Sequence, residues 1–430
     1  MGTVRSATRR GTADGERDEF ATILDGRQLR AVFQPVINLA DRHVVAYEAL
    51  ARGPLGSPHE SPAALFAAAA AADRVTELDW ACRAAAFAAV CGASGPRLPA
   101  SVPLFVNCEP SSMRTPCPPD LRSGILAAEA QLTVVMEVTE RDIATDPAGL
   151  LSAVGRAREQ TWGVALDDVG AEPDSLALMP FVHPDIIKLD LRLIQDRTTA
   201  EVARIVNAVL AQAERTGAAI LAEGIETKRH EDIARALGAT LGQGWLYGRP
   251  GGLPPTVDEP PHPLQLLHPT TSVWSRTPFD IVAAQRPTIV AAKDLLMPMS
   301  RHLENRGVDS VEPPVLLACF QEAAHFTEQT RARFERLATH ASFVGAVGAG
   351  MDDQPARGVR GASLDSTDRL RGEWDVIVVG PHFAGALVAR DCGDDGPDRD
   401  RRFEAVITYD RELVIEAARS LLGKLTPGQS

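Results

Sequence analysis

The chain has 430 residues, a length that corresponds to two or three domains. Hydrophobic residues make up 45% and charged residues 23%, which is typical of soluble globular proteins and argues against a disordered chain. The formal net charge of −13 argues against binding to nucleic-acid polymers or anionic membranes, because both depend on a basic surface. No apolar run is long enough for a membrane span, and residues 1–16 lack the apolar core of a secretory signal. We therefore expect a cytoplasmic protein with a disordered tail over residues 1–18.

Apolar runs and helical patterns alternate from residue 31 to residue 246. The first two runs, 31–37 and 44–50, are joined by a connection too short for a parallel crossover, so they should pair antiparallel. Further strands are expected at residues 102–107, 132–137, 163–170, 186–190, 218–223 and 240–246. Helices are expected from Pro62, at 76–90, 120–130 and 148–160, and from a capping box at Thr198 or Thr199. About eight strands over roughly 230 residues predict an α/β fold, a closed TIM-type barrel with a reversed first strand.

Charged and amide side chains stand at the ends of these expected strands, where the chemistry of such barrels takes place. They are Asn107, Glu137, Asp167, Asp168, Lys188 and Glu223. Taken alone, the Asp167-Asp168 pair also fits a helix cap or a turn, and Lys188 also fits a salt-bridge partner. Two adjacent carboxylates at the end of a buried run are nevertheless costly unless cations neutralise them. The recurrence of such residues favours oxygen ligands for two divalent cations, Mg²⁺ or Mn²⁺.

The sequence Glu48-Ala49-Leu50, followed by Arg52, resembles the signature of the EAL family of cyclic di-GMP phosphodiesterases. Other motifs of that family follow in similar order: Phe33-Gln34-Pro35, Asn107, Glu137-Val138-Thr139-Glu140, Asp167-Asp168, Lys188-Leu189-Asp190, Glu223-Gly224-Ile225-Glu226-Thr227 and Gln243-Gly244-Trp245. The resemblance covers residues 20–250, within an expected domain at 19–250. It implies a barrel that hydrolyses cyclic di-GMP to linear 5′-pGpG with Mg²⁺ or Mn²⁺.

Position by position, the resemblance implies two groups of metal ligands and one group of substrate contacts. The first metal would be held by Glu48, Asn107, Glu137 and Asp167. The second would be held by Asp167, Asp168 and Glu223. Glu223 is otherwise the expected general base, and Lys188 would orient or polarise the attacking water. The substrate would be contacted by Gln34, Arg52, Asp190, Glu226 and Gln243.

The segment after Asp168 departs from the family pattern. The family usually has Phe-Gly there, followed by a flexible segment that couples metal binding to dimer contacts. Here residues 169–176 read Val-Gly-Ala-Glu-Pro-Asp-Ser-Leu, in which Pro173 fixes the backbone and two acids are added. Three alternatives stay open: an active phosphodiesterase, a catalytically weak cyclic di-GMP receptor that signals through protein partners, and an interaction scaffold. A homodimer is also open.

A second domain follows a proline-rich stretch at residues 251–270, which predicts a semi-rigid linker, with a partner-binding segment as the alternative. Residues 271–430 predict a smaller α+β domain, with a helix over 314–340, strands at 342–347, 374–379, 385–390 and 403–408, and a final helix over 411–425.

This second domain resembles the DICT sensory domain through Gly372-Glu373-Trp374-Asp375-Val376, Val379-Gly380-Pro381-His382-Phe383 and Ala389-Arg390-Asp391. The resemblance implies regulation of the barrel by a ligand or partner that the sequence does not identify. His382 has no second metal ligand spaced beside it and is expected to be structural. Trp374 is expected in the core rather than as a stacking platform.

Overall fold

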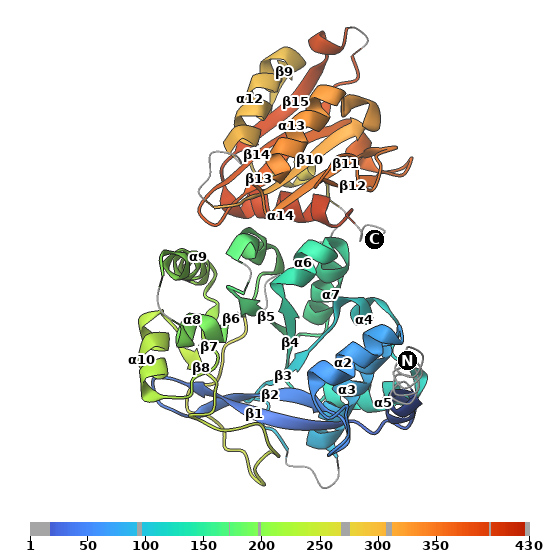
Figure 1. Ribbon diagram of the computed structural model, residues 1–430. Coiled ribbons are helices and arrows are strands. Elements are labelled where there is room, and N and C mark those ends of the chain that lie inside the picture. The colour runs from blue at the N-terminus through green and yellow to red at the C-terminus, as the bar shows by residue number, and fades with distance from the viewer. Residues whose placement is uncertain are drawn as a thin grey trace, which may run out of the picture.

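The computed structural model describes residues 18–92, 97–171, 173–196, 199–267, 276–306, 312–394 and 397–425. Almost all of the tail predicted at residues 1–18 lies outside these ranges. The described chain forms a closed eight-stranded barrel, followed by a separate seven-stranded sheet with its own helices (Figure 1). No helix in the described ranges is long and apolar enough to cross a membrane.

The barrel follows the strand order of the sequence. Its strands are β1 (Arg30–Asn38), β2 (Val44–Arg52), β3 (Leu104–Asn107), β4 (Val134–Thr139), β5 (Gly163–Val169), β6 (Ile186–Leu189), β7 (Ala219–Ala222) and β8 (Leu241–Gly242). β1 pairs antiparallel with both β2 and β8, while all other neighbours are parallel. The predicted barrel with a reversed first strand is therefore confirmed.

Helices surround this barrel (Figure 1). They are α2 (Pro62–Ala71), α3 (Val75–Cys91), α4 (Pro110–Arg114), α5 (Pro119–Glu129), α6 (Glu140–Thr145), α7 (Pro147–Glu159), the 3₁₀ helix η1 (Pro173–Val182), α8 (Leu191–Gln195), α9 (Ala200–Thr216) and α10 (Lys228–Ala236). Several begin as their sequences predict: the side chains of Ser61, Asp146 and Thr199 accept backbone N–H groups at the starts of α2, α7 and α9.

Alternate residues of the strands face the barrel interior and form its floor. This floor cluster includes Val36, Ala46, Phe105, Val135, Ala165, Ile186, Leu221 and Leu241. The residues between them, such as Leu104, Met136 and Leu166, face outward into the core under the helices. The alternation of side chains along each strand thus separates the inner apolar layer from the outer one. It also determines which residues near the ends of the strands point into the barrel mouth.

The stretch predicted as a linker is described from residue 251 to residue 267. Gly251 exchanges backbone hydrogen bonds with Phe33, at 2.7 and 3.0 Å. Leu264 and Leu266 pack against the floor cluster, and the Leu267 N–H donates to Asp185 Oδ1 at 2.5 Å. Residues 264–267 therefore pack against the barrel at the end where the parallel strands begin, while Gly251 pairs with β1 nearer the mouth.

The C-terminal domain is built on a mixed sheet in the order β12-β11-β10-β13-β14-β15-β9. Its strands are β9 (Ile289–Ala292), β10 (Val315–Glu322), β11 (Phe343–Ala349), β12 (Arg360–Ser363), β13 (Glu373–Val379), β14 (Ala384–Asp391) and β15 (Arg402–Thr408). Its helices are α11 (Pro278–Ala283), α12 (Lys293–Arg306), α13 (Glu328–Ala338) and α14 (Arg411–Leu422), with short 3₁₀ helices η2 (Ala323–His325), η3 (Arg369–Gly372) and η4 (Asp398–Asp400). The predicted α+β domain is confirmed.

The helices of this domain cover opposite faces of the sheet. Leu303 of α12 and Phe334 of α13 share a core with Val376 and Val378 of β13. Val414 of α14 packs in the core that contains Ile377, a residue of the other face. The sheet therefore separates an α12–α13 side from an α11–α14 side.

The helix predicted over residues 314–340 is wrong in its first part. Residues Val315–Glu322 form the central strand β10, and only Glu328–Ala338 form a helix, α13. The run Val315 to Cys319 is buried on both faces, so it lacks the alternation that distinguishes a strand from a buried helix. Thr327 accepts the Thr330 N–H and marks the real start of the helix.

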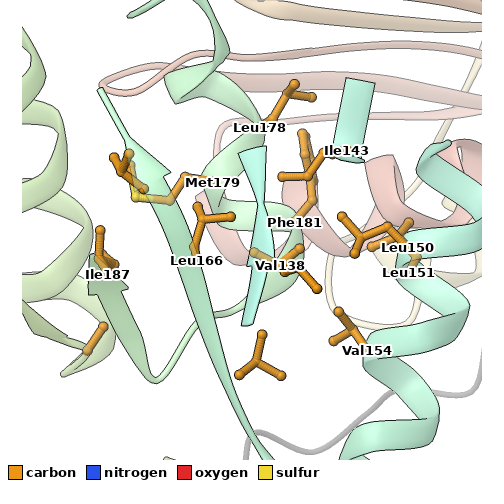
Figure 2. Close-up of a cluster of buried hydrophobic side chains, with 14 of the residues drawn as sticks. Val138, Ile143, Leu150, Leu151, Val154, Leu166, Leu178, Met179, Phe181 and Ile187 are labelled. Atoms are coloured by element: carbon orange, nitrogen blue, oxygen red, sulfur yellow. The ribbon is translucent and has the colours of Figure 1, made fainter. Parts of the chain in front are cut away.

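The two domains meet where α14 contacts α7 and η1 (Figure 1). The Ala148 N–H donates to the Leu425 carbonyl at 3.2 Å, and Arg360 Nη1 donates to the Thr145 carbonyl at 3.1 Å. η1 is itself anchored in the barrel, as Figure 2 shows: Leu178 and Phe181 lie in one apolar cluster with side chains of β4, β5, α6 and α7. η1 therefore connects the end of β5 with the C-terminal domain.

Candidate metal centre

Each site residue at the barrel mouth lies two positions along the chain from a residue of the floor cluster. In each parallel strand an inward apolar residue is followed, two positions later, by a polar one that faces the same way. The pairs are Ala46 and Glu48, Phe105 and Asn107, Val135 and Glu137, Ala165 and Asp167, Ile186 and Lys188, Leu221 and Glu223, and Leu241 and Gln243. In the reversed strand β1, Gln34 precedes Val36 by the same offset. Because side chains alternate between the two faces of a strand, these eight polar side chains all point toward the same mouth of the barrel.

Lys188 stands at the centre of this group. Its Nζ lies 2.6 Å from Glu137 Oε1, 3.0 Å from both Asp167 Oδ1 and Glu223 Oε1, and 3.7 Å from Glu48 Oε1. The Lys188 side chain is only 1% exposed. Asn107 joins the group through a hydrogen bond of 3.1 Å from its Nδ2 to Glu137 Oε2. The four residues predicted for the first metal, Glu48, Asn107, Glu137 and Asp167, are thus brought together.

A second subset lies at the more exposed side of the mouth. Asp167, Asp168 and Glu223 each offer a carboxylate oxygen, and these oxygens lie within 4.8 Å of one another. The register between β5 and β6 shifts between Leu166 and Val169, and Asp168 has φ +56°. Asp tolerates this left-handed backbone better than most residues, and such a bulge redirects side chains. The irregularity therefore lets two consecutive carboxylates serve one site.

Burial and mutual repulsion shift the pKa values of this group. Burial, with repulsion from Glu48 next, raises the pKa of Glu137 well above its usual range. Burial also raises the pKa of Glu223 to about 8, although Lys188 opposes the shift. For Lys188, burial alone would lower the pKa, but Asp167, Glu137 and the other carboxylates hold it well above its usual range. Five carboxylates share one ammonium, so oxygen-preferring divalent cations fit this donor set.

The residues predicted to contact substrate occupy two kinds of position. Gln243 Nε2 donates to Glu48 Oε2 at 2.5 Å and to Gln34 Oε1 at 3.2 Å, so both glutamines border the carboxylates. Arg52 lies at the end of β2 and donates to the Ala51 carbonyl at 2.8 Å, and its guanidinium interacts electrostatically with Glu48 and Glu60.

Asp190 and Glu226 have other surroundings. Asp190 Oδ1 accepts both the backbone N–H and the Nε–H of Arg192, each at 2.8 Å, and so caps α8. Glu226 is exposed, and its N–H donates to His230 Nδ1 at 3.3 Å. Neither side chain contacts Lys188 among the ion pairs of the described residues.

Beside the mouth lies a cavity of about 350 Å³ that the sequence did not indicate. It extends from Asn107 and Glu137 to α2 and α3, and Glu109 and Asp142 line it. Burial raises the pKa of Glu109 to about 7. Glu109 follows the end of β3, where the strand period no longer predicts direction, so its orientation was not foreseeable.

A buried ion pair holds the segment after β3. Arg83 Nη2 donates to Asp79 Oδ2 at 2.8 Å and to Ser112 Oγ at 2.7 Å, and Asp79 Oδ1 accepts the Glu109 N–H at 3.2 Å. Asp79 and Arg83 are each 2% exposed. In the sequence, this ion pair could have been recognised from two opposite charges four residues apart on the apolar face of the predicted helix 76–90.

Comparison with known proteins agrees with this arrangement. The model of the EAL domain matches residues 17–250, which is more than half of the 430 residues. The model of DICT, described as a sensory domain in diguanylate cyclases and two-component systems, matches residues 272–391.

Among curated relatives, cyclic di-GMP phosphodiesterase RocR of Pseudomonas aeruginosa is 32% identical over 122 residues, 27% of this chain and 30% of the relative. Cyclic di-GMP phosphodiesterase NbdA of the same organism is 29% identical over 247 residues, 54% of this chain and 30% of the relative. The chain thus spans less than a third of their lengths.

Among solved structures, the manganese and cyclic di-GMP complex of Klebsiella pneumoniae BlrP1 is 30% identical, covers 53% of this chain and 57% of that chain, and has a TM-score of 0.44. The extent of the first family match is decisive, because it covers the whole barrel and all of its mouth residues. The chain belongs to the EAL domain family, and a DICT sensory domain follows its barrel.

Proposed function

We propose that the barrel hydrolyses cyclic di-GMP to linear 5′-pGpG with two divalent cations, Mg²⁺ or Mn²⁺. The observation that carries this proposal is the convergence of Glu48, Glu137, Asp167 and Glu223 on Lys188 Nζ, all within 3.7 Å. The relatives named as cyclic di-GMP phosphodiesterases support it, as does the related BlrP1 complex with manganese and cyclic di-GMP.

The charge balance of the mouth explains why cations are needed. Five carboxylates face one ammonium, and when they are ionised their negative charge exceeds that of Lys188 and repels a substrate with two phosphodiester groups. When bound, divalent cations neutralise this charge, polarise the phosphoryl oxygens and lower the pKa of water. Glu48, Asn107, Glu137 and Asp167 would hold one of them, and Asp167, Asp168 and Glu223 the other.

The remaining residues have distinct roles in this proposal. Lys188 would orient the attacking water through its Nζ, and Glu223 would act as the general base that takes the proton. Arg52 would bind a substrate phosphate through its planar guanidinium. Gln34, Gln243, Asp190 and Glu226 are assigned to contacts with the remainder of the substrate.

A turnover assay on the purified full chain tests the proposal. With Mn²⁺ or Mg²⁺, cyclic di-GMP should be converted to 5′-pGpG, which is separated by chromatography. Glu48→Gln should lower the rate by about 10²–10³-fold, the usual cost of a removed electrostatic contributor. Glu159→Gln, a matched change at an exposed position of α7, should leave the rate unchanged. Wild-type turnover no higher than that of a Glu48→Gln/Glu223→Gln double variant would rule out hydrolysis.

The second candidate is a catalytically weak receptor for cyclic di-GMP. It is favoured by the segment after Asp168, which leads directly into η1 and thereby into the contact with α14. Tight binding by calorimetry without turnover in either metal would select the receptor, and absence of binding would select an interaction scaffold.

We also propose that the C-terminal domain regulates the barrel. The proposed domain limits are residues 19–250, 251–270 and 271–430, and the protein is proposed to be cytoplasmic and to form a homodimer. Separation of the domains at α14 is the direct test of regulation. Glu416 and Arg419 lie on that helix, and substitutions that weaken its contact with η1 should change the rate of turnover.

A further inference from the structure

A second cavity, of about 290 Å³, lies in the C-terminal domain between α12 and α13. It is on the sheet face opposite α14. Phe320 of β10, Trp374 of β13 and Phe403 of β15 form its floor. The rings of Trp374 and Phe403 meet edge to face, with centroids 5.6 Å apart. Trp374 was expected in the core, and at 9% exposure it is buried, yet it also lines the cavity. Such a floor favours a flat aromatic ligand.

The buried carboxylate in the wall is an acceptor. Glu304 of α12 is 2% exposed and lines the cavity. Arg333 Nε donates to its Oε2 at 2.6 Å, and Ser300 Oγ donates to its Oε1 at 3.3 Å. A carboxylate has about four acceptor positions, so these two bonds leave capacity for a donor from a ligand.

His325 adds a second acceptor. Its Nδ1 lies 2.8 Å from the Phe320 carbonyl oxygen. Because a carbonyl only accepts, Nδ1 carries a hydrogen, so Nε2 is the ring nitrogen left for a ligand, and in this tautomer it accepts an N–H. Both groups can therefore accept an N–H donor from a ligand in the cavity.

The best-buried cations of the wall are already paired. Lys293 and Arg333 have side chains that are each 19% exposed, and they bind Asp398 at 2.6 Å and Glu304 at 2.6 Å. Arg301 and Arg399 also line the cavity, but both are exposed. In the buried part, an anionic ligand would compete with Asp398 or Glu304 for the two paired cations, whereas a ligand with N–H donors can bind Glu304 without breaking its ion pair.

The wall also contains a strained residue. Gln321 follows the regular part of β10 with φ +60°, where the pairing with β11 shifts register. Non-glycine residues rarely adopt this backbone conformation, and such positions cluster at ligand sites. Arg401 Nη2 holds Gln321 there by donating to its Oε1 at 3.2 Å. Gln321 is buried and lines the cavity.

We propose that this cavity binds a planar heteroaromatic molecule of one or two rings that carries amino or ring N–H donors. Its rings stack on Trp374 and Phe320, and its donors bind Glu304 and His325. Such a ligand differs from the proposed substrate, which carries two sugars and two phosphates besides its two bases. Binding itself does not depend on the proposed regulatory function. An effect of the ligand on the barrel does depend on it, because the cavity lies on one face of the sheet and α14, which contacts η1, lies on the other.

Calorimetric titration of the full chain tests this site, with adenine as the probe. The comparison compound is 2-naphthoate, which has two flat rings, a negative charge and no N–H donor. Adenine should bind, and both Glu304→Gln and His325→Phe should weaken it at least tenfold. Glu328→Gln on exposed α13 surface and His302→Phe on exposed α12 surface are the matched controls and should change nothing. The His325 variant keeps the test decisive if Glu304→Gln does not fold.

Three outcomes would overturn the proposal. They are no binding heat with adenine at millimolar concentration, 2-naphthoate binding as tightly as adenine, or adenine binding that survives both cavity substitutions. The titration is repeated with a Glu48→Gln chain, whose barrel is inactive under the proposed function. Adenine binding should be the same there, so that a failure of the phosphodiesterase proposal and a failure of the cavity proposal are separated.

Discussion

The barrel and the C-terminal domain both bury charged side chains, but they assemble them in different ways. In the barrel, parallel strands end at one mouth, so Glu137, Asp167 and Lys188 meet although they come from different strands. In the C-terminal sheet most neighbouring strands are antiparallel, so their carboxyl ends point alternately to opposite ends of the sheet. Its cavity lies between helices instead, and Glu304 and Arg333 come from α12 and α13. Parallel strands thus bring charged side chains together at the strand ends, whereas in the mixed sheet the charged side chains meet in the helical layer that covers it.

The largest effect should come from removing the central cation of the barrel. Lys188 serves four carboxylates, while Arg333 serves Glu304 alone and is partly exposed. Lys188→Met should lower the free energy of unfolding by about 3–5 kcal/mol in EDTA, because buried charges lose their partner. Arg333→Met should cost clearly less. Urea denaturation of both variants measures this, and equal losses would contradict the difference between the two regions.

A smaller effect is expected at the boundary between the regions, where His183 lies. Burial, together with Arg419 of α14 and Arg158 of α7, lowers the pKa of His183 to about 4. An unfolded histidine titrates near about 6.5, so between these values only the unfolded chain binds the proton. Stability should therefore fall as pH drops from about 6.5 to about 4, by roughly 3 kcal/mol from this residue.

The control for this prediction is His183→Asn, because asparagine tolerates the observed φ of +45°. Denaturation midpoints of wild type and variant are compared across the pH range. Parallel curves would mean that the histidine is solvated and that the two domains do not enclose it.

The smallest effect concerns the far end of the barrel. Leu266 packs against the floor cluster, so Leu266→Ala should cost about 1–2 kcal/mol, the range for a half-buried leucine. The same change at Leu295 of α12, which is 55% exposed, should cost almost nothing. A loss at Leu266 that is no larger than the loss at Leu295, measured by urea denaturation, would mean that the stretch is a free spacer.

The sequence was most informative where the strand period applied. Val135 and Ala165 predict an inward direction for Glu137 and Asp167, and the same count gives Lys188 from Ile186. The period fails beyond strand ends, which is why Glu109 was missed. In the C-terminal domain, β10 lacks alternation and was taken for helix. β9 was missed because Ile289–Ala292 is a short edge strand whose first two residues are exposed. The roles assigned to Arg52, Asp190 and Glu226 come from family resemblance and stay predictions.

The position of Lys188 has a consequence for how the protein is made. A cluster of acids without a resident cation would hold the barrel open until metal arrived, as in small domains that fold only on binding zinc. Here the ammonium, within 3.0 Å of three carboxylates, acts as an internal counter-ion during synthesis. If the barrel is the proposed phosphodiesterase, scarcity of divalent ions in the cell should reduce its turnover while leaving the amount of folded barrel unchanged.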